Sequence, residues 1–207
     1  QNSPAVGIWL HNSTKSSISN NTIAKCDSGI YSDFSNGNVI ENNWVSDSYA
    51  GIILSSVCKE NRISNNDVIG NTRGIDLSNH AHHNEIRNNR IVQNTYGVSI
   101  SLDNNSIFGN QIINNAVGIY EDLYVGPAHE YKIFHNNFVN NTRQFKLLSQ
   151  PSVIWDNGYP SGGNYWSGFT VKALYNGPSQ NLLGSDGIGD TPYSIDAFNR
   201  DKYPLLK

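Results

Sequence analysis

Aromatic and acidic residues recur at one phase of a sequence repeat in this chain. Each lies directly after a Gly-Ile or Gly-Val pair or two residues further on: Trp9, Tyr31, Asp33, Asp76, Tyr120 and Asp122. Flat aromatic rings match the apolar faces of sugars, and carboxylates accept hydrogen bonds from hydroxyl groups. These residues predict a binding strip for an extended polysaccharide or cell-surface glycan. The alternative is that the aromatic residues only pack across neighbouring strands.

Three histidines in one short segment form a second group: His80, His82 and His83. Imidazole is a common ligand of transition metals, so this segment is a candidate copper site. Such a site needs three or four convergent donors. The chain has no methionine to supply a thioether. A solvated turn is the alternative interpretation.

A third group is acidic and lies near the C-terminus. Asp186 and Asp190 flank the run Gly-Ile-Gly, so a curled backbone would direct both carboxylates and the carbonyl of Ile188 toward one cation, with Asp196 completing the shell. Calcium accepts six to eight oxygen ligands in irregular geometry. We therefore predict a calcium site here, with an Asp/Gly turn as the alternative. We expect no organic cofactor.

Catalytic residues are harder to assign. A lyase or C5-epimerase acting on uronate polymers needs a base and a cation that neutralises the carboxylate. Tyr31 and Tyr96 are candidate bases, and Arg73, Arg87 and Arg90 are candidate cations. No pair of acids at the spacing of a glycosidase is visible. The sequence therefore favours binding over catalysis and leaves the catalytic residues unknown.

The elements that must position these groups belong to the repeat. A glycine followed by a β-branched residue recurs at a nearly constant interval, at Gly7, Gly29, Gly51, Gly74, Gly97 and Gly118. Within each unit apolar residues alternate with polar ones, the pattern of a strand. Short strands in a fixed repeat predict an all-β fold, a right-handed parallel β-helix of about seven coils rising about 4.8 Å each.

Asparagine is abundant and keeps its phase with the isoleucines. We expect two stacked columns in which each amide bonds to the coils on both sides and in which asparagine adopts the left-handed backbone of a bend. The first column is Asn21, Asn43, Asn66, Asn89, Asn110 and Asn136; the second is Asn38, Asn61, Asn84 and Asn105. Cys26 and Cys58 lie at different phases and are expected to be free thiols.

Periodicity stops near residue 150, where tryptophan, tyrosine, glycine and proline become frequent. Residues 1–150 are therefore assigned to the coils and residues 151–207 to an irregular aromatic and glycine-rich cap of the same domain. A solenoid needs such a cap because its last coil would otherwise expose apolar side chains. The aromatic residues expected to fill this end are Trp155, Tyr159, Tyr165, Trp166 and Phe169.

The units of the form Gly-Ile-x-Leu followed by Asn-x-Ile-x-Asn-Asn-x-Ile resemble the repeats of NosD-like β-helix proteins, which are grouped with carbohydrate-binding proteins and sugar hydrolases. Residues 155–166, 184–193 and 201–205 resemble the C-terminal segments of archaeal and bacterial secreted members. The resemblance implies an extracellular, cell-surface or periplasmic location. It also raises a copper-handling accessory role, since NosD is associated with maturation of the copper centre of a periplasmic reductase.

Composition restricts the remaining possibilities. The net charge of −3 gives no reason to expect nucleic acid as a partner. No apolar run is long enough to span a membrane. The chain begins within a repeat unit and has no initiator methionine, so we expect a piece of a longer protein, with the open N-terminal end as a candidate surface for assembly. The favoured function is a structural or polysaccharide-binding module at a cell surface.

Overall fold

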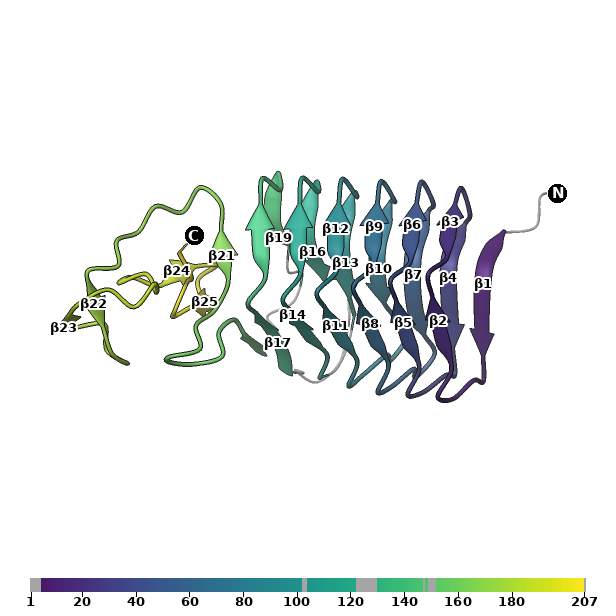
Figure 1. Cartoon of the computed structure of the whole chain (residues 1–207), viewed down its shortest axis with the longest axis horizontal. Coiled ribbons are helices and arrows are strands. Elements are labelled where there is room, and N and C mark those ends of the chain that lie inside the picture. Colours follow the sequence, from purple (N-terminus) through teal and green to yellow (C-terminus); the bar gives the residue numbers. More distant parts are fainter. Residues whose placement is uncertain (1–4, 102–103, 122–129, 147, 149–151, 207) are drawn as a thin grey trace.

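The computed structural model describes residues 5–101, 104–121, 130–146, 148 and 152–206. These residues contain strands and turns but no helix, and most of them wind into a parallel β-helix, so the predicted fold class is confirmed. The coils stack along the long axis of the molecule, with the N-terminus at one end and the cap at the other (Figure 1). Within the described residues, no helix is available to cross a membrane.

Three parallel sheets of seven strands each form the walls of the β-helix. Sheet 1 contains β1 (Val6–His11), β4 (Ser28–Asp33), β7 (Ala50–Ser55), β10 (Arg73–Leu77), β13 (Tyr96–Ile100), β16 (Val117–Glu121) and β19 (Arg143–Lys146). Sheet 2 contains β2 (Ser17–Ser19), β5 (Val39–Glu41), β8 (Arg62–Ser64), β11 (Glu85–Arg87), β14 (Ser106–Phe108), β17 (Glu130–Phe134) and β20 (Ser152–Ile154). Sheet 3 contains β3 (Thr22–Ala24), β6 (Trp44–Ser46), β9 (Asp67–Ile69), β12 (Arg90–Val92), β15 (Gln111–Ile113), β18 (Asn137–Val139) and β21 (Tyr165–Trp166).

The strands of the β-helix continue beyond residue 150. The seventh coil combines β19 with β20 and β21, and Phe138 of β18 is paired with Trp166 of β21. The rest of the cap holds two antiparallel hairpins, formed by β22 (Tyr175–Asn176) with β23 (Leu182–Leu183) and by β24 (Tyr193–Ser194) with β25 (Arg200–Asp201).

The core is a set of vertical columns of β-branched side chains. Ile30, Ile52 and Ile75 occupy one register of sheet 1 and are fully buried. Alternation within each strand directs every second side chain inward, and parallel register places each above its equivalent in the previous coil. Each coil therefore buries its apolar side chains against similar neighbours on both sides.

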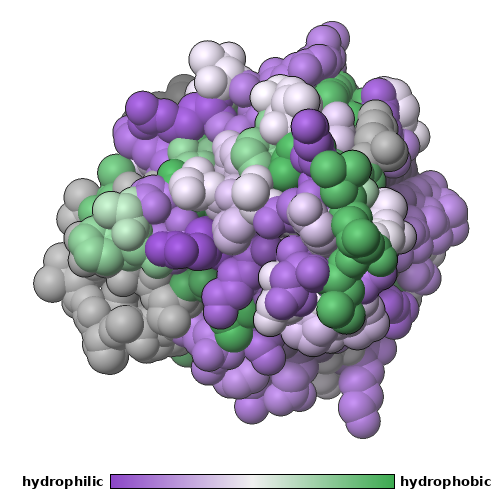
Figure 2. All heavy atoms as spheres, turned by 90° about the vertical axis from the view of Figure 1, so that its left-hand side faces the viewer, coloured by the Kyte–Doolittle hydropathy of each residue, from purple (hydrophilic) through white to green (hydrophobic). Residues whose placement is uncertain are grey.

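Aromatic side chains close the C-terminal end, as predicted. Trp166 stacks between Phe138 and Tyr193, with ring centroids 4.4 Å away on both sides. Trp155 is buried beside it and Phe169 packs against the same cluster. Tyr159 and Tyr165 are half-buried, and the ring of Tyr159 contacts that of Tyr203. Seen from this end, hydrophobic side chains form separate patches among hydrophilic ones (Figure 2). Among the described residues of the cap, the most exposed large hydrophobic ones are Leu182, Leu183 and Phe198.

Asparagine ladders run along the corners of the coil. In one column, each backbone N–H from Asn21 to Asn136 donates to the side-chain oxygen of the next member, and the ladder extends to Asn164 of the cap. A second ladder joins Asn38 to Asn105, and a third runs through Ser48, Asn71 and Asn94 to Asn141. These bonds satisfy buried polar groups that no strand pairing reaches.

The predicted left-handed backbone is one residue out of place. The ladder asparagines do not have positive φ. Within the repeats the residue before each of them does, as at Asn42, Asn65 and Asn88 with φ of 54–56°. This arrangement follows from the two demands of a corner: the bend needs the left-handed residue, and the ladder needs the next side chain to point inward. One asparagine therefore does not serve both purposes.

The glycine column of sheet 1 is dictated by close backbone contact. A Cβ on Gly51 would lie 2.6 Å from the carbonyl oxygen of Gly74 and 2.9 Å from Cγ1 of Val68. We expect Gly51→Ala to lower the free energy of unfolding by about 2 kcal/mol, because the clash is with backbone that cannot turn away. Gly37→Ala, at an open turn with φ of 65°, should cost only about 1 kcal/mol, as measured by urea denaturation. Equal losses would contradict the steric explanation.

Candidate functional site

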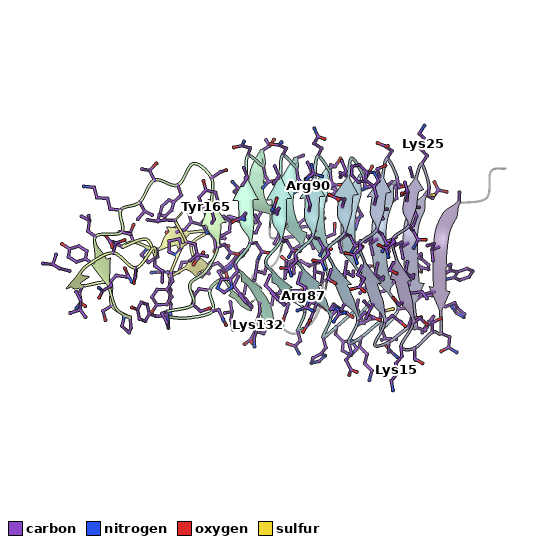
Figure 3. The ribbon with its side chains drawn as sticks, viewed as in Figure 1. Lys15, Lys25, Arg87, Arg90, Lys132 and Tyr165 are labelled. Carbon is purple, nitrogen blue, oxygen red and sulfur yellow. The ribbon has the colours of Figure 1, made fainter. Side chains whose placement is uncertain are left out.

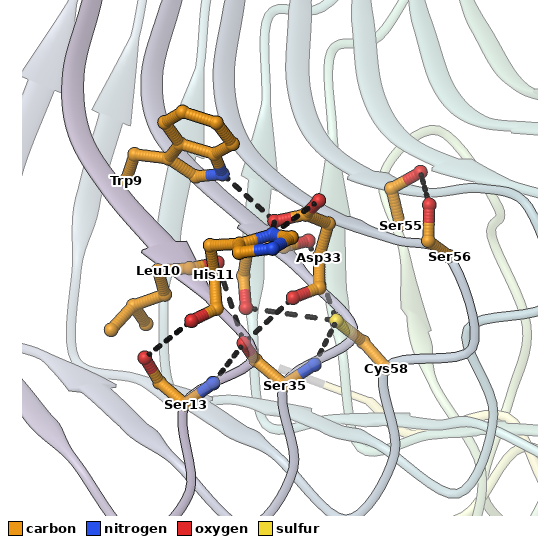
Figure 4. Close-up of polar contacts among 10 residues, drawn as sticks. Trp9, Leu10, His11, Ser13, Asp33, Ser35, Ser55, Ser56 and Cys58 are labelled. Atoms are coloured by element: carbon orange, nitrogen blue, oxygen red, sulfur yellow. Dashed lines mark hydrogen bonds and ion pairs between the residues drawn. The ribbon is translucent and has the colours of Figure 1, made fainter.

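The outward side chains at the N-terminal end of sheet 1 form a polar and aromatic cluster. Strands β1 and β4 pair in parallel register, with Trp9 beside Tyr31 and His11 beside Asp33. The indole Nε1–H of Trp9 donates to Oδ1 of Asp33 over 2.8 Å, and Nδ1 of His11 lies 3.0 Å from Oδ2 of the same carboxylate (Figure 4). Asp33 therefore holds two side chains of the preceding coil.

The Asp33 carboxylate is covered by the groups that it binds. Only 10% of its side chain is exposed, against 58% for His11. An ionised carboxylate only accepts hydrogen bonds, so Nδ1 of His11 must carry the proton of that bond. The other ring nitrogen of His11, Nε2, belongs to the more exposed side chain of the His11–Asp33 pair. Burial of Asp33 is compensated because two N–H groups replace the water that it loses.

Trp9 forms an exposed and oriented aromatic surface. The residue is 61% exposed, yet its indole nitrogen is tied to Asp33. The ring centroid of Tyr31 lies 6.4 Å away and that of His11 lies 5.4 Å away, both rings tilted by 50–55° to the indole. Phe34 meets His11 edge-on at 6.1 Å. The four rings form an aromatic cluster whose central indole has lost much of its rotational freedom before any ligand binds.

The predicted strip along sheet 1 has the expected register. Tyr31 is followed in its column by Ile53, Asp76, Ser99 and Tyr120. Asp76 faces outward but is nearly buried, since Arg73 covers it with an ion pair of 3.2 Å. Asp122 lies outside the described residues. The strip therefore carries charge that is largely paired, which sequence spacing alone does not reveal.

A second aromatic group lies near the C-terminal end of sheet 1. The ring of Tyr120 packs on that of Tyr96 with centroids 4.3 Å apart, and Nζ of Lys146 lies 5.5 Å from the centre of the Tyr120 ring. Five coil steps separate Trp9 from Tyr120, about 24 Å at the inter-strand spacing. Lys146 was not predicted from the sequence, although its place in the column of Tyr120 was the available signal.

The histidine turn does not assemble a metal site. Nδ1 of His82 lies 2.8 Å from the carbonyl oxygen of His80, and the rings of His82 and His83 meet edge-on with centroids 5.2 Å apart. The neighbour of His82 in the adjacent coil is Lys59, a cation. Within the described residues, no three His, Cys, Asp or Glu side chains come close enough to hold a metal ion. The arrangement of His80, His82 and His83 therefore does not fit a copper site.

The acidic residues of the cap bind nearby protein groups. Asp186 accepts from the backbone N–H of Ile188, Asp190 accepts from the N–H groups of Leu174 and Tyr175, and Asp196 accepts from Phe198 and Asn199. Ile188 itself is buried and bridges to Leu205. Asp186 and Asp196 thus each organise their own turn, whereas Asp190 holds a segment 15–16 residues earlier in the chain. The calcium site stays a prediction from the sequence.

The three arginines proposed as catalytic cations lie on different walls of the coil. The candidate bases Tyr31 and Tyr96 both lie on sheet 1, where Arg73 is the register partner of Tyr96. Arg73, Arg87 and Arg90 belong to β10, β11 and β12, which are strands of sheets 1, 2 and 3. Figure 3 shows Arg87 and Arg90 on separate rows of strands, and Arg90 pairs with Asp67 at 2.9 Å.

Cys26 and Cys58 are both free thiols, as expected. Cys58 is buried and contacts Ser32 and Ser35.

Comparison with known proteins shows the family of the chain and its similarity in fold to a solved structure. The family model described as periplasmic copper-binding protein NosD matches residues 1–171. A crystal structure of a double mutant of the periplasmic alginate epimerase AlgG is similar in fold, with a TM-score of 0.57 and 18% sequence identity over 72% of this chain. The match covers 48% of the epimerase chain, and at this identity the likeness concerns the fold alone. No curated protein matches the sequence.

Proposed function

The chain belongs to the NosD family, and we propose that it is a β-helix module outside the cytoplasm whose sheet 1 binds an extended polysaccharide. The location is supported by the descriptions of the family and of the fold relative, both of which refer to periplasmic proteins. The observation that carries the binding role is the exposed indole of Trp9, held in place by Asp33 and flanked by Tyr31 and His11.

The hydrogen bond to Asp33 prepares Trp9 for stacking. An isolated exposed indole would be free to rotate, and binding would have to restrict it. The bond from Trp9 to Asp33 restricts it in the free protein, so a sugar ring can stack on the indole with little further loss of entropy. The exposed part of His11 and the Tyr31 ring lie close enough to contact the same sugar.

The length of the strip favours a polymer over a small molecule. The inter-strand spacing places the aromatic groups at Trp9 and Tyr120 about 24 Å apart along the coil axis. The side chains between them follow the same parallel register. A polysaccharide chain lying along the axis would contact both groups at once. Two weak contacts on one chain then combine, because the second becomes intramolecular.

The test is glycan binding by a Trp9→Ala and Tyr31→Ala double variant. We expect an affinity at least about tenfold lower, equivalent to about 1.4 kcal/mol, because the stacking surface is removed. Isothermal titration with polysaccharides selected on a glycan array measures the change. Trp44→Ala is the matched control, since Trp44 is also an exposed strand tryptophan but lies on sheet 3. Equal losses in both variants, or none in the double variant, would contradict the proposal.

A further inference from the structure

We infer that the C-terminal end of the same strip binds the acidic group of an anionic sugar, so that the polysaccharide recognised is a uronate polymer. The inference rests on the proposed function and concerns a site formed by Arg143 and Lys146 of β19. These two side chains occupy the positions that Arg73 and Asp76 occupy three coils earlier. At the earlier coil the two charges neutralise each other; at β19 both are positive.

Neither Arg143 nor Lys146 has a carboxylate partner on its strand, whereas Arg73 has Asp76. Arg73 contacts Asp76 at 3.2 Å across the same two strand positions. Among the residues that the structure describes, no ion pair joins Arg143 or Lys146 to an acid, and Lys146 instead lies over the ring of Tyr120. Two like charges on one short strand repel each other, and an anion placed between them would turn repulsion into attraction.

A cleft lies directly beside these cations. It has a volume of about 380 Å³ and lies between β19 and the cap, with Arg143, Gln144, Phe145, Lys146, Tyr193 and Asp196 as its lining. This volume falls within the range typical of sites for small ligands. Asp196 is the one acid of the lining, and its oxygens accept hydrogen bonds from the backbone of Phe198 and Asn199 and from the Asn199 amide. With two cations and one acid among its lining residues, the cleft carries an excess of positive charge.

The chemistry of the lining matches an acidic sugar. The guanidinium of Arg143 presents a planar pair of donors suited to a carboxylate or sulfate, while Lys146 supplies a compact charge. The Tyr120 ring lies beside Lys146 and offers a flat surface for the apolar face of the sugar. At the other end of the strip the Asp33 charge is engaged by Trp9 and His11, so a polymer would meet aromatic contacts there and cations here.

The test compares two oligosaccharides that differ only in charge. The probes are a hexuronate oligomer and the same oligomer with its carboxyl groups reduced to alcohols. We expect the protein to bind the acidic oligomer at least about tenfold more tightly in titration calorimetry, and the Arg143→Gln and Lys146→Gln double variant to lose this preference while still binding the reduced oligomer. The matched control is Arg87→Gln with Lys132→Gln, which removes the same charge from sheet 2 and should keep the preference. Thermal melting confirms that each variant is folded.

The outcomes separate this inference from the proposed function. Equal binding of the two oligomers by the unaltered protein would overturn the anion site and leave polysaccharide binding intact. A preference that survives in the Arg143 and Lys146 double variant would also overturn it, since the charge recognition would then lie elsewhere. Absence of binding to both oligomers and to every polysaccharide of the array would overturn the proposed function and this inference with it.

Discussion

Replacing Asn66 with alanine is expected to lower the free energy of unfolding by about 3–5 kcal/mol. The Asn66 side chain is buried, and its amide donates to the carbonyl oxygens of Ile40 and Ser64 and to Oδ1 of Asn89. Its own oxygen accepts from the backbone N–H of Asn43. Alanine would leave several of these groups buried without partners, each at a cost of about 1–3 kcal/mol before relaxation. Urea denaturation measures the loss.

Asn21→Ala is the matched control in the same ladder. Asn21 is half-buried in the first coil. Its side-chain amide donates to Asn43, and its side-chain oxygen accepts from no residue that the structure describes. Its replacement should cost about 1 kcal/mol, because water can reach the groups left behind. A loss as large as that of Asn66→Ala would mean that the residue type, and not its burial within the ladder, sets the cost.

At pH 4, Asp201→Asn is expected to destabilise the cap by about 2–4 kcal/mol. Asp201 is fully buried, and its two oxygens accept from the backbone N–H groups of Asn164 and Tyr203 and from the indole of Trp166. Asparagine has one oxygen and one NH₂ group, so at least one of these donors would face another donor. Thermal melting followed by tryptophan fluorescence measures the effect near the cap. An unchanged melting temperature would show that the ladder does not depend on this acceptor.

The same residue predicts a dependence on pH. Burial raises the pKa of the Asp201 carboxyl to about 6, against the lowering effect of its three hydrogen bonds. Unfolded aspartate titrates near pH 3.9, so between these values the folded state binds more protons than the unfolded state. The contribution of Asp201 protonation to stability is therefore complete below about pH 4 and is lost as the pH rises through 6. The loss is about 3 kcal/mol.

Comparison of the unaltered protein with Asp201→Asn isolates this contribution, because all other titrating groups are shared. The difference in melting temperature should shrink from pH 4 to pH 7. A difference that stays constant over this range would contradict the raised pKa of Asp201.

The repeat made the coil predictable, since a fixed period determines which residues become vertical neighbours. The column from Asn43 to Asn89 and the column from Tyr31 to Tyr120 could both be read from spacing alone. What ends the ladder could not. Asn164 and Asp201 come from a segment without periodicity, where no repeat relates one position to another, and 37 residues separate the two.

The candidate site was predicted in position but not in chemistry. Spacing placed Asp33 and Asp76 on the outer face, yet both are nearly buried. Their coverage depends on single side chains that depart from the repeat: Trp9 and His11 for the first, Arg73 for the second. The repeat phase does not reveal such exceptions, because contact between neighbouring columns depends on the length and direction of each side chain as well as on its phase.

The ladder that runs from Asn21 to Asn164 ends on a group of a different kind, the carboxylate of Asp201. Each inner asparagine both donates and accepts hydrogen bonds. Every coil therefore presents the same interface to the coils on both sides, and these hydrogen bonds do not limit the number of coils. Asp201 receives from Asn164 and, once ionised, has no side-chain hydrogen with which to continue. The Asp201 carboxylate therefore terminates the ladder. Duplication of whole repeat units would preserve every hydrogen bond before it, and the β-helix ends where a carboxylate replaces the next asparagine.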